Sequence, residues 1–432
     1  MYFFEFLYLT REKTDLINSI FEKFFSAVKF YSLRVEFSFE EYRKRTIEWN
    51  LQRLRRYIWT TLRSWLVILY IGAMSFWPNC PIPGIHYLLG RFPVDRHDLM
   101  FGYYIIMILW VETLSLVLLR SLICYDMRLN DALQNLIESK PGANEMLSEK
   151  ILNNFFRKYL LLSFVFNLIF RGVYCFVSGI YILVLIDLFQ KLYSQQLTPI
   201  EVVSVAVMGH HLYRESIFFC GKLFNELFGF AFTGNFYLRK FINLVHLFGK
   251  VLKRKKSQQR NRMIQQYSQE YLHQSFEISL VNHSSRKVFF IIEMMSKCSI
   301  VFILLFYNNQ TQMNLYSDLL LFMVSLFCLV SATLMAKVSS FECWNNLLFR
   351  SIISWQIRNQ FSLQRKSPIY HQIYGQASLL NDIRMNYFIQ NISLNRIGFT
   401  CGQIFNITKF KFIELQLMNC ILVFLFYKRF LL

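Results

Sequence analysis

The sequence predicts an all-α membrane protein with seven transmembrane helices, a cytoplasmic N-terminus and an extracellular C-terminus. Three observations predict this fold class. Apolar residues make up 54% of the 432 residues and charged residues only 17%, against roughly 45–50% and about 25% in soluble globular chains. Long apolar runs recur along the whole chain, and the segments between them alternate between rich and poor in Lys and Arg.

The first half of the chain is expected to hold a cytoplasmic segment and four spans. Residues 1–56 are mixed in charge and end in the basic run RKRTIEWNLQRLRR, so we expect them to stay in the cytoplasm. Transmembrane helices 1 to 4 are predicted within 57–235, at 57–78, 100–123, 158–190 and 199–235. Arg63 lies near the start of the first span, where we expect its long side chain to reach the headgroups.

The second half is predicted to hold three spans and two polar segments. A basic helical segment in the cytoplasm is expected at 236–287, and it contains the run KVLKRKKSQQRNR. Transmembrane helices 5 and 6 follow within 288–337, at 288–308 and 315–337. The remaining segments are a cytoplasmic helical anchor at 338–402 and a final transmembrane helix at 403–432.

Loop charges set the orientation. Lys and Arg number eleven before the first span and eleven in the fourth loop, whereas the third loop has one and the fifth has none. Basic loops stay in the cytoplasm, which puts the N-terminus inside and, after an odd number of spans, the C-terminus outside. A multi-pass protein of the plasma membrane is the resulting expectation.

Charge and cysteine placement exclude several classes of protein. The net charge of +20 accompanies no nucleic-acid-binding module, so we expect the basic run to face anionic membrane lipid and no nucleic acid to be a partner. Nine scattered cysteines make no paired CxxC motif, which argues against a metal site or a disulfide framework. Motifs such as HExxH and GxSxG are missing, so we expect no enzyme, no catalytic residues and no cofactor.

The last helix carries polar residues inside its apolar run. At 100° per residue, one stripe gathers Lys409, Phe412, Gln416, Asn419, Cys420, Val423, Phe426 and Tyr427. The stripe is polar toward the cytoplasmic end and apolar toward the outer end, as in a water-filled path closed by a hydrophobic constriction. A helix-packing face with Gln416 and Asn419 bonding across helices has the same pattern, and both interpretations stay open.

The same region, NRIGFTCGQIFNITKFKFIELQLMNCILVFLFY, resembles the C-terminal signature of the insect gustatory receptor family. Phe399, Cys401 and Gly402 match a Phe-x-(Ala/Cys)-Gly-x-Phe segment, and Phe405, one residue further on than the pattern has it, matches its last Phe. The family's last helix then has Thr-Tyr, five hydrophobic residues and Gln-Phe. Here Asn419 and Cys420 replace the first pair, and Phe426 and Tyr427 replace the second.

The resemblance implies a chemosensory receptor that is a ligand-gated, non-selective cation channel opened by an extracellular small molecule. Four related subunits, in a homo- or hetero-tetramer, would each line a central pore with the last helix. Val423 and Tyr427 would narrow that pore, with Phe426 close by. Because the Thr-Tyr and Gln-Phe pairs are lost, the alternative is a non-conducting, gustatory-receptor-like binding or recognition protein.

Ionisable residues inside the spans are candidates for a ligand pocket, because a charge in hydrocarbon is costly unless it is paired or hydrated. The candidates are Glu112, His210, His211 and Arg214. Each has a structural alternative: Glu112 pairing with Arg171 or another buried base, and a hydrated part of the fourth helix for the others, where His211 and Glu215 are four residues apart. Glu293 and Lys297, also four apart, are expected to neutralise one another.

Overall fold

The computed structural model describes residues 41, 44–76, 97–126, 168, 171–172, 174–175, 177–179, 181–253, 257–309, 315–364, 368–394 and 397–431. The helices with defined bounds are α4 (Leu51–Phe76), α6 (His97–Ile123), α9 (Pro199–Leu252), α10 (Ser257–Asn309), α11 (Leu315–Val338), α12 (Ser340–Gln364), α13 (Pro368–Leu394) and α14 (Lys409–Leu431). Residues 181–193 are also helical. Two short antiparallel strands, β1 (Thr400–Cys401) and β2 (Phe405–Asn406), form a hairpin just before α14.

Two helices run through most of the molecule. α9 has 54 residues and α10 has 53, so each is about 80 Å long, well beyond the ~30 Å hydrocarbon core of a bilayer. α9 passes through 235 and α10 through 287 without a break, so each apolar span continues into the basic segment as one helix; the predicted division between span and cytoplasmic segment at these positions stays a prediction. α9 begins with a capping box, in which Thr198 and Glu201 satisfy each other's backbone N–H groups.

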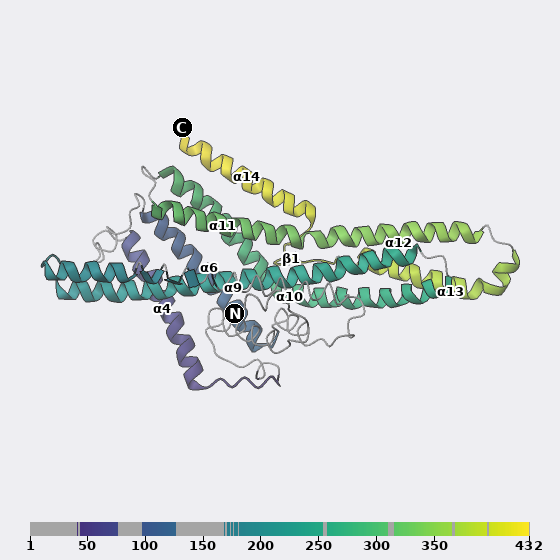
Figure 1. Ribbon diagram of the computed structural model, residues 1–432, viewed down its shortest axis with the longest axis horizontal. Coiled ribbons are helices and arrows are strands. Elements are labelled where there is room, and N and C mark those ends of the chain that lie inside the picture. The colour runs from purple at the N-terminus through teal and green to yellow at the C-terminus, as the bar shows by residue number, and fades with distance from the viewer. Residues whose placement is uncertain are drawn as a thin grey trace, which may run out of the picture.

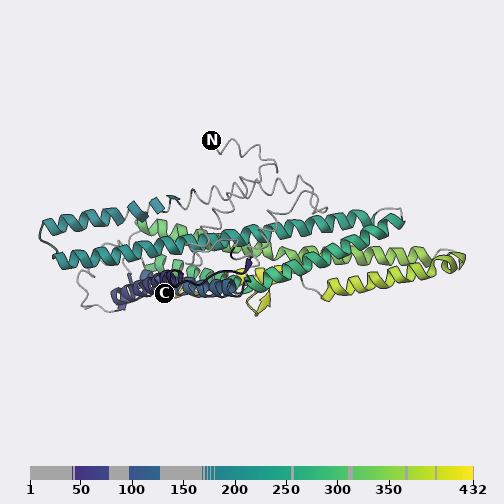
Figure 2. The same ribbon diagram turned by 90° about the horizontal axis from the view of Figure 1, so that it is seen from below.

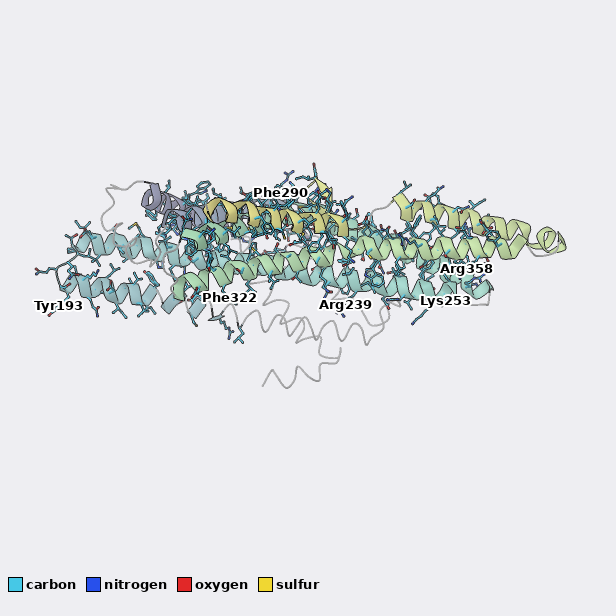
Figure 3. All side chains as sticks on the ribbon, turned by 90° about the horizontal axis from the view of Figure 1, so that it is seen from above. Tyr193, Arg239, Lys253, Phe290, Phe322 and Arg358 are labelled. Carbon is cyan, nitrogen blue, oxygen red and sulfur yellow. The ribbon has the colours of Figure 1, made fainter. Side chains whose placement is uncertain are left out.

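The molecule is elongated, and its two ends are built from different helices (Figures 1 and 2). At one end lie α4, α6, helix 181–193, the start of α9, the end of α10, α11 and α14. The end of α9, the start of α10, α12 and α13 make up the other end. Tyr193 marks the first end, whereas Lys253 and Arg358 lie toward the second, with Phe290 between (Figure 3). The predicted basic and anchor segments thus lie side by side.

The second end, where the predicted basic segment and anchor segment lie, has an aromatic core of its own. Phe248 stacks on Phe388 with ring centroids 5.9 Å apart, and Tyr271 meets Phe388 edge-on at 5.4 Å. The buried Tyr271 hydroxyl donates to Asn345 Oδ1 at 2.9 Å. Aromatic pairs with a satisfied hydroxyl are typical of a specific protein core. The segment that follows α11 is therefore packed against α9 and α10 rather than loosely tethered.

The protein is a helical membrane protein. Within the described residues, three helices are long and apolar enough to cross a membrane, over Phe101–Ile123, Arg260–Asn309 and Val324–Phe361. The last of these continues from α11 into α12. The predicted third span, 158–190, lies largely outside the described residues. The predicted segment 403–432 begins with the second half of the hairpin, so its helix starts only at Lys409.

Candidate functional site

The hairpin between α13 and α14 holds the residues that match the family signature. The Phe399 ring lies between those of Phe289 on α10 and Phe341 on α12, each at 5.5 Å between centroids. Cys401 is buried, and Phe405 packs against the core. Phe399 and Cys401 thus anchor the hairpin by burial, which explains why the motif asks for an aromatic and a small residue at these places.

The backbone of the hairpin is bonded directly to α10. The Gly402 N–H donates to the Arg286 carbonyl at 2.8 Å, and the Thr400 N–H donates to Asn282 Oδ1 at 2.7 Å. Gly402 has a φ of 61°, in the left-handed region that favours glycine. We call this hairpin, residues 399–407 with its contacts on α10, the clasp. It fixes the point from which the last helix departs.

Burial also sets the chemistry of the clasp cysteine. Enclosure raises the pKa of the Cys401 thiol to about 12, and the negative charge of Glu293 adds to this effect. The thiol therefore stays protonated near neutral pH, where a thiolate would be needed for nucleophilic or redox chemistry. Cys401 is a packing residue.

α14 packs mainly along α10, and Thr408 caps its start by accepting from the Lys411 N–H at 3.0 Å. The predicted polar stripe lies at the edge of this contact. Gln416 and Asn419 are half-buried, whereas Cys420 and Val423 are exposed. The stripe therefore runs along a seam between the face packed on α10 and a wide exposed apolar face. Phe426 and Tyr427 continue the helix one turn further, and their side chains lie outside the described ones.

Asn419 forms a specific bond across helices. Its Oδ1 accepts a hydrogen bond from Lys297 Nζ on α10 at 3.3 Å. The same ammonium lies 3.0 Å from Glu293 Oε1, which confirms the predicted Glu293–Lys297 pair. The helix-packing interpretation therefore holds for Asn419 in the single chain. The sequence pattern pointed to Asn419 but gave no sign of its partner 122 residues earlier.

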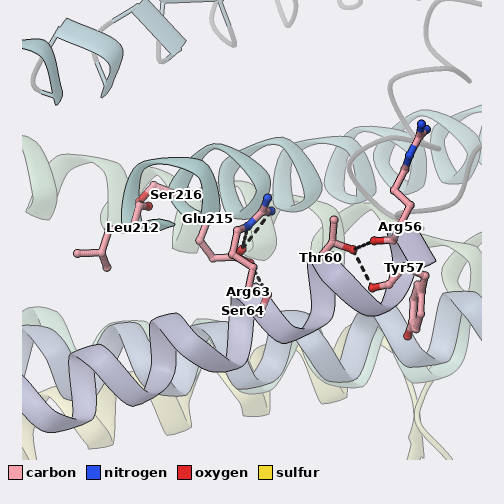
Figure 4. Close-up of polar contacts among 8 residues, drawn as sticks. All are labelled: Arg56, Tyr57, Thr60, Arg63, Ser64, Leu212, Glu215 and Ser216. Atoms are coloured by element: carbon pink, nitrogen blue, oxygen red, sulfur yellow. Dashed lines mark hydrogen bonds and ion pairs between the residues drawn. The ribbon is translucent and has the colours of Figure 1, made fainter. Parts of the chain in front are cut away.

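A second charged cluster lies between α4 and α9 (Figure 4). Arg63 Nε is 3.4 Å from Glu215 Oε2, and the Ser64 hydroxyl donates to Glu215 Oε1 at 2.6 Å. The Arg63 guanidinium also lies over the Phe218 ring, 4.7 Å from its centroid. Arg63 was expected to reach the headgroups, and that expectation is wrong because the side chain is buried in the middle of α4.

The four pocket candidates do not line one surface. His211 is half-buried, with its ring 6.5 Å from that of Tyr70 on α4. His210 and Arg214 are exposed on another side of α9. Adjacent residues on a helix point about 100° apart, so this separation follows from the sequence spacing. Glu215, four residues beyond His211, bonds to Arg63 and Ser64.

Glu112 and Arg171 differ in burial. Glu112 is buried within the packing of α6, whereas Arg171 is exposed. The suggested pairing of these two residues stays a prediction. Sequence reasoning missed Arg63 as a site residue, although a carboxylate inside an apolar helix signals that a base must lie nearby.

The fold matches solved structures of an insect chemoreceptor. The insect olfactory receptor OR5 from Machilis hrabei has a TM-score of 0.62 and 9% sequence identity, over 95% of this chain and 98% of the receptor. The same receptor in complex with eugenol has a TM-score of 0.60 and 11% identity, over 99% of each chain. No protein-family model and no curated protein sequence matches this chain. The resemblance to insect chemoreceptors is thus confirmed at the level of the fold.

Proposed function

We propose, from this shared fold, that the chain is a chemosensory receptor subunit of the plasma membrane and forms a ligand-gated, non-selective cation channel of four subunits. The observation that carries the proposal is the match to two structures of an olfactory receptor, over 95% or more of this chain and of the receptor. One of those two structures is in complex with eugenol. A small molecule arriving from outside is the proposed ligand. The gustatory signature in the clasp supports the same class of receptor.

The seam on α14 supports a pore lined by the last helix. Along it, half-buried Gln416 lies toward the clasp, and the exposed side chain of Val423 lies further out. Tyr427 follows Val423 by four residues and so falls near the same face. If four copies present this seam to a common axis, the pore is polar toward its cytoplasmic end. It closes at an apolar ring formed by Val423 and Tyr427, which gates by dewetting.

The ligand is proposed to bind in the outer half, among the helices that surround His211 and Glu112. His211 lies beside Tyr70, and the Arg63–Glu215 pair follows about one turn further along α9. An aromatic and imidazole lining above a buried ion pair suits a small organic molecule with one polar group. His210 and Arg214, on the exposed side of α9, are proposed to contact lipid or a neighbouring subunit instead.

Patch-clamp recording tests the channel. We expect Val423→Ala and Tyr427→Ala to raise the current without ligand, because each shortens a side chain of the proposed apolar constriction. Ile421→Ala is the matched control, because Ile421 is 50% exposed on the far side of the same helix. Surface biotinylation checks that all three variants reach the membrane. Currents equal to wild type in both pore variants would contradict the pore assignment.

Two observations favour the alternative of a non-conducting binding protein. Asn419 and Cys420 replace the family's Thr-Tyr pair, and Asn419 is engaged by Lys297. In addition, Lys428 and Arg429 bring positive charge to the end of α14, which disfavours cations at a pore mouth. Saturable binding of small molecules to the purified protein, together with silence in patch clamp for wild type and both pore variants, would select this alternative.

A further inference from the structure

The Lys297 ammonium joins the last helix to its main neighbour. Its Nζ is 3.0 Å from Glu293 Oε1 on its own helix and 3.3 Å from Asn419 Oδ1 on α14. A charged donor to a neutral amide makes a stronger hydrogen bond than two neutral groups do. Asn419 stands where the resembled signature has Thr, so this chain has replaced a short hydroxyl by an amide oxygen that reaches further.

Asn419 lies where α14 leaves the rest of the chain. The clasp fixes the start of α14 through the bond from Gly402 to Arg286. Asn419 is ten residues beyond Lys409, or about 15 Å by helix rise. Past it, the described side chains at 420, 421 and 423–425 are exposed and that at 422 is half-buried. The Lys297 bond is therefore a second attachment, placed just before the segment proposed to close the pore.

We propose that Lys297 is a positioning residue: its bond to Asn419 holds the outer part of α14 against α10 in the closed channel and is released when the channel opens. The gating part of this proposal rests on the function proposed above. Glu293 makes release feasible, because it keeps Lys297 paired after Asn419 has left. No isolated charge is then stranded among apolar helices, a state that is strongly unfavourable. We call the Glu293–Lys297–Asn419 set the latch.

A double-mutant cycle tests whether the latch exists. Thermal unfolding is measured on the purified full-length protein with Asn419→Leu, Lys297→Met and both together. We expect Asn419→Leu to lower the Tm in the wild-type background and to have no further effect once Lys297 is Met, because the bond is already gone. Asn419→Gln keeps an amide oxygen and should retain the coupling. Met418→Leu is the matched control, since it places the same side chain one residue earlier at an exposed position.

Recording of currents tests what the latch does. Removing a bond to a charged group from the closed state alone shifts the open-to-closed ratio by roughly ten-fold. We therefore expect Asn419→Leu to raise the current without ligand, and to lower the half-activating concentration of any ligand found for the wild type by about that factor. Asn419→Gln should restore behaviour close to wild type, and Met418→Leu should not change it.

The outcomes separate this inference from the function on which it rests. Additive Tm changes at positions 297 and 419 would overturn the latch, whatever the currents show. Coupled Tm changes with wild-type currents in Asn419→Leu would overturn its role in gating. Coupled Tm changes without current in any variant would establish the attachment, reject its gating role and reject the channel. Coupled Tm changes, together with a current that is raised in Asn419→Leu but not in Asn419→Gln or Met418→Leu, would support the whole proposal.

Discussion

Two of the charged clusters within the described helices, Arg63–Glu215 and Glu293–Lys297, differ in how exposed their side chains are. In the Arg63–Glu215 pair the side chains are 6% and 4% exposed, whereas in the Lys297–Glu293 pair they are 25% and 11% exposed. The first pair joins α4 to α9. The second lies within α10 and reaches α14 through Asn419.

This difference in exposure indicates different roles. A fully buried pair has lost its hydration, so it needs extra partners, and here Ser64 donates to Glu215 while Phe218 lies under Arg63. Such a set is stable only when it is complete. The Lys297 cluster keeps some contact with its surroundings and has a neutral third member, so it can lose that member and stay paired. We infer that the first cluster is a fixed part of the scaffold and that the second can rearrange.

The largest effect is expected from Glu215→Leu. This change leaves the Arg63 guanidinium buried without its carboxylate, which destabilises a folded protein by about 3–5 kcal/mol. We expect a strong fall in surface expression and in the Tm of the purified protein. The double variant Arg63→Met with Glu215→Leu removes both charges and should recover much of the loss. A single variant as stable as wild type would contradict the fixed role of this pair.

A medium effect is expected at the clasp, on which the latch depends for the position of α14. Gly402 has a φ of 61°, so Gly402→Ala places a side chain in the left-handed region at about 1–2 kcal/mol. The added Cβ would meet Phe290 at 3.6 Å, an ordinary contact, so the cost arises from the backbone. Gly249→Ala is a control of opposite sign: within α9, with no atom of the described residues within 4 Å of the new Cβ, it should stabilise by up to about 1 kcal/mol. Unfolding of the purified variants measures both.

Much of the helical layout is readable from the sequence. The sixth span was predicted at 315–337 and α11 covers Leu315–Val338, because a polar loop precedes that helix. The continuity of α9 through 235 and of α10 through 287, where the sequence turns from apolar to basic, has a physical reason. A change from apolar to basic residues alters which solvent a helix suits without ending it, since Leu, Lys and Arg all favour helix. Only a breaker or a cap would have marked a true end.

In the candidate site, contacts between residues close in the sequence could be predicted, and contacts between residues far apart could not. Glu293 and Lys297 are one helical turn apart, so their pairing could be predicted from spacing alone. Arg63 and Glu215 are 152 residues apart, and no local pattern connects them. The signature residues Phe399, Cys401 and Gly402 could be recognised but not explained, because their partners lie on α10 and α12. Tertiary packing, which the spacing of one helix does not contain, supplies those partners.

The smallest effect is expected from Glu414→Gln, and it tests whether exposure is the property that separates the clusters. Glu414 pairs with Lys411 at 2.6 Å on α14, as close as any ion pair above, but the two side chains are 47% and 40% exposed. An exposed pair at this spacing contributes only about 0.2–0.5 kcal/mol, so the Tm should move by about 1 °C or less. Lys411→Gln should match it, because neither partner is left buried. A loss as large as that of Glu215→Leu at this exposed pair would contradict the comparison, and distance rather than exposure would then be the better guide to the strength of these pairs.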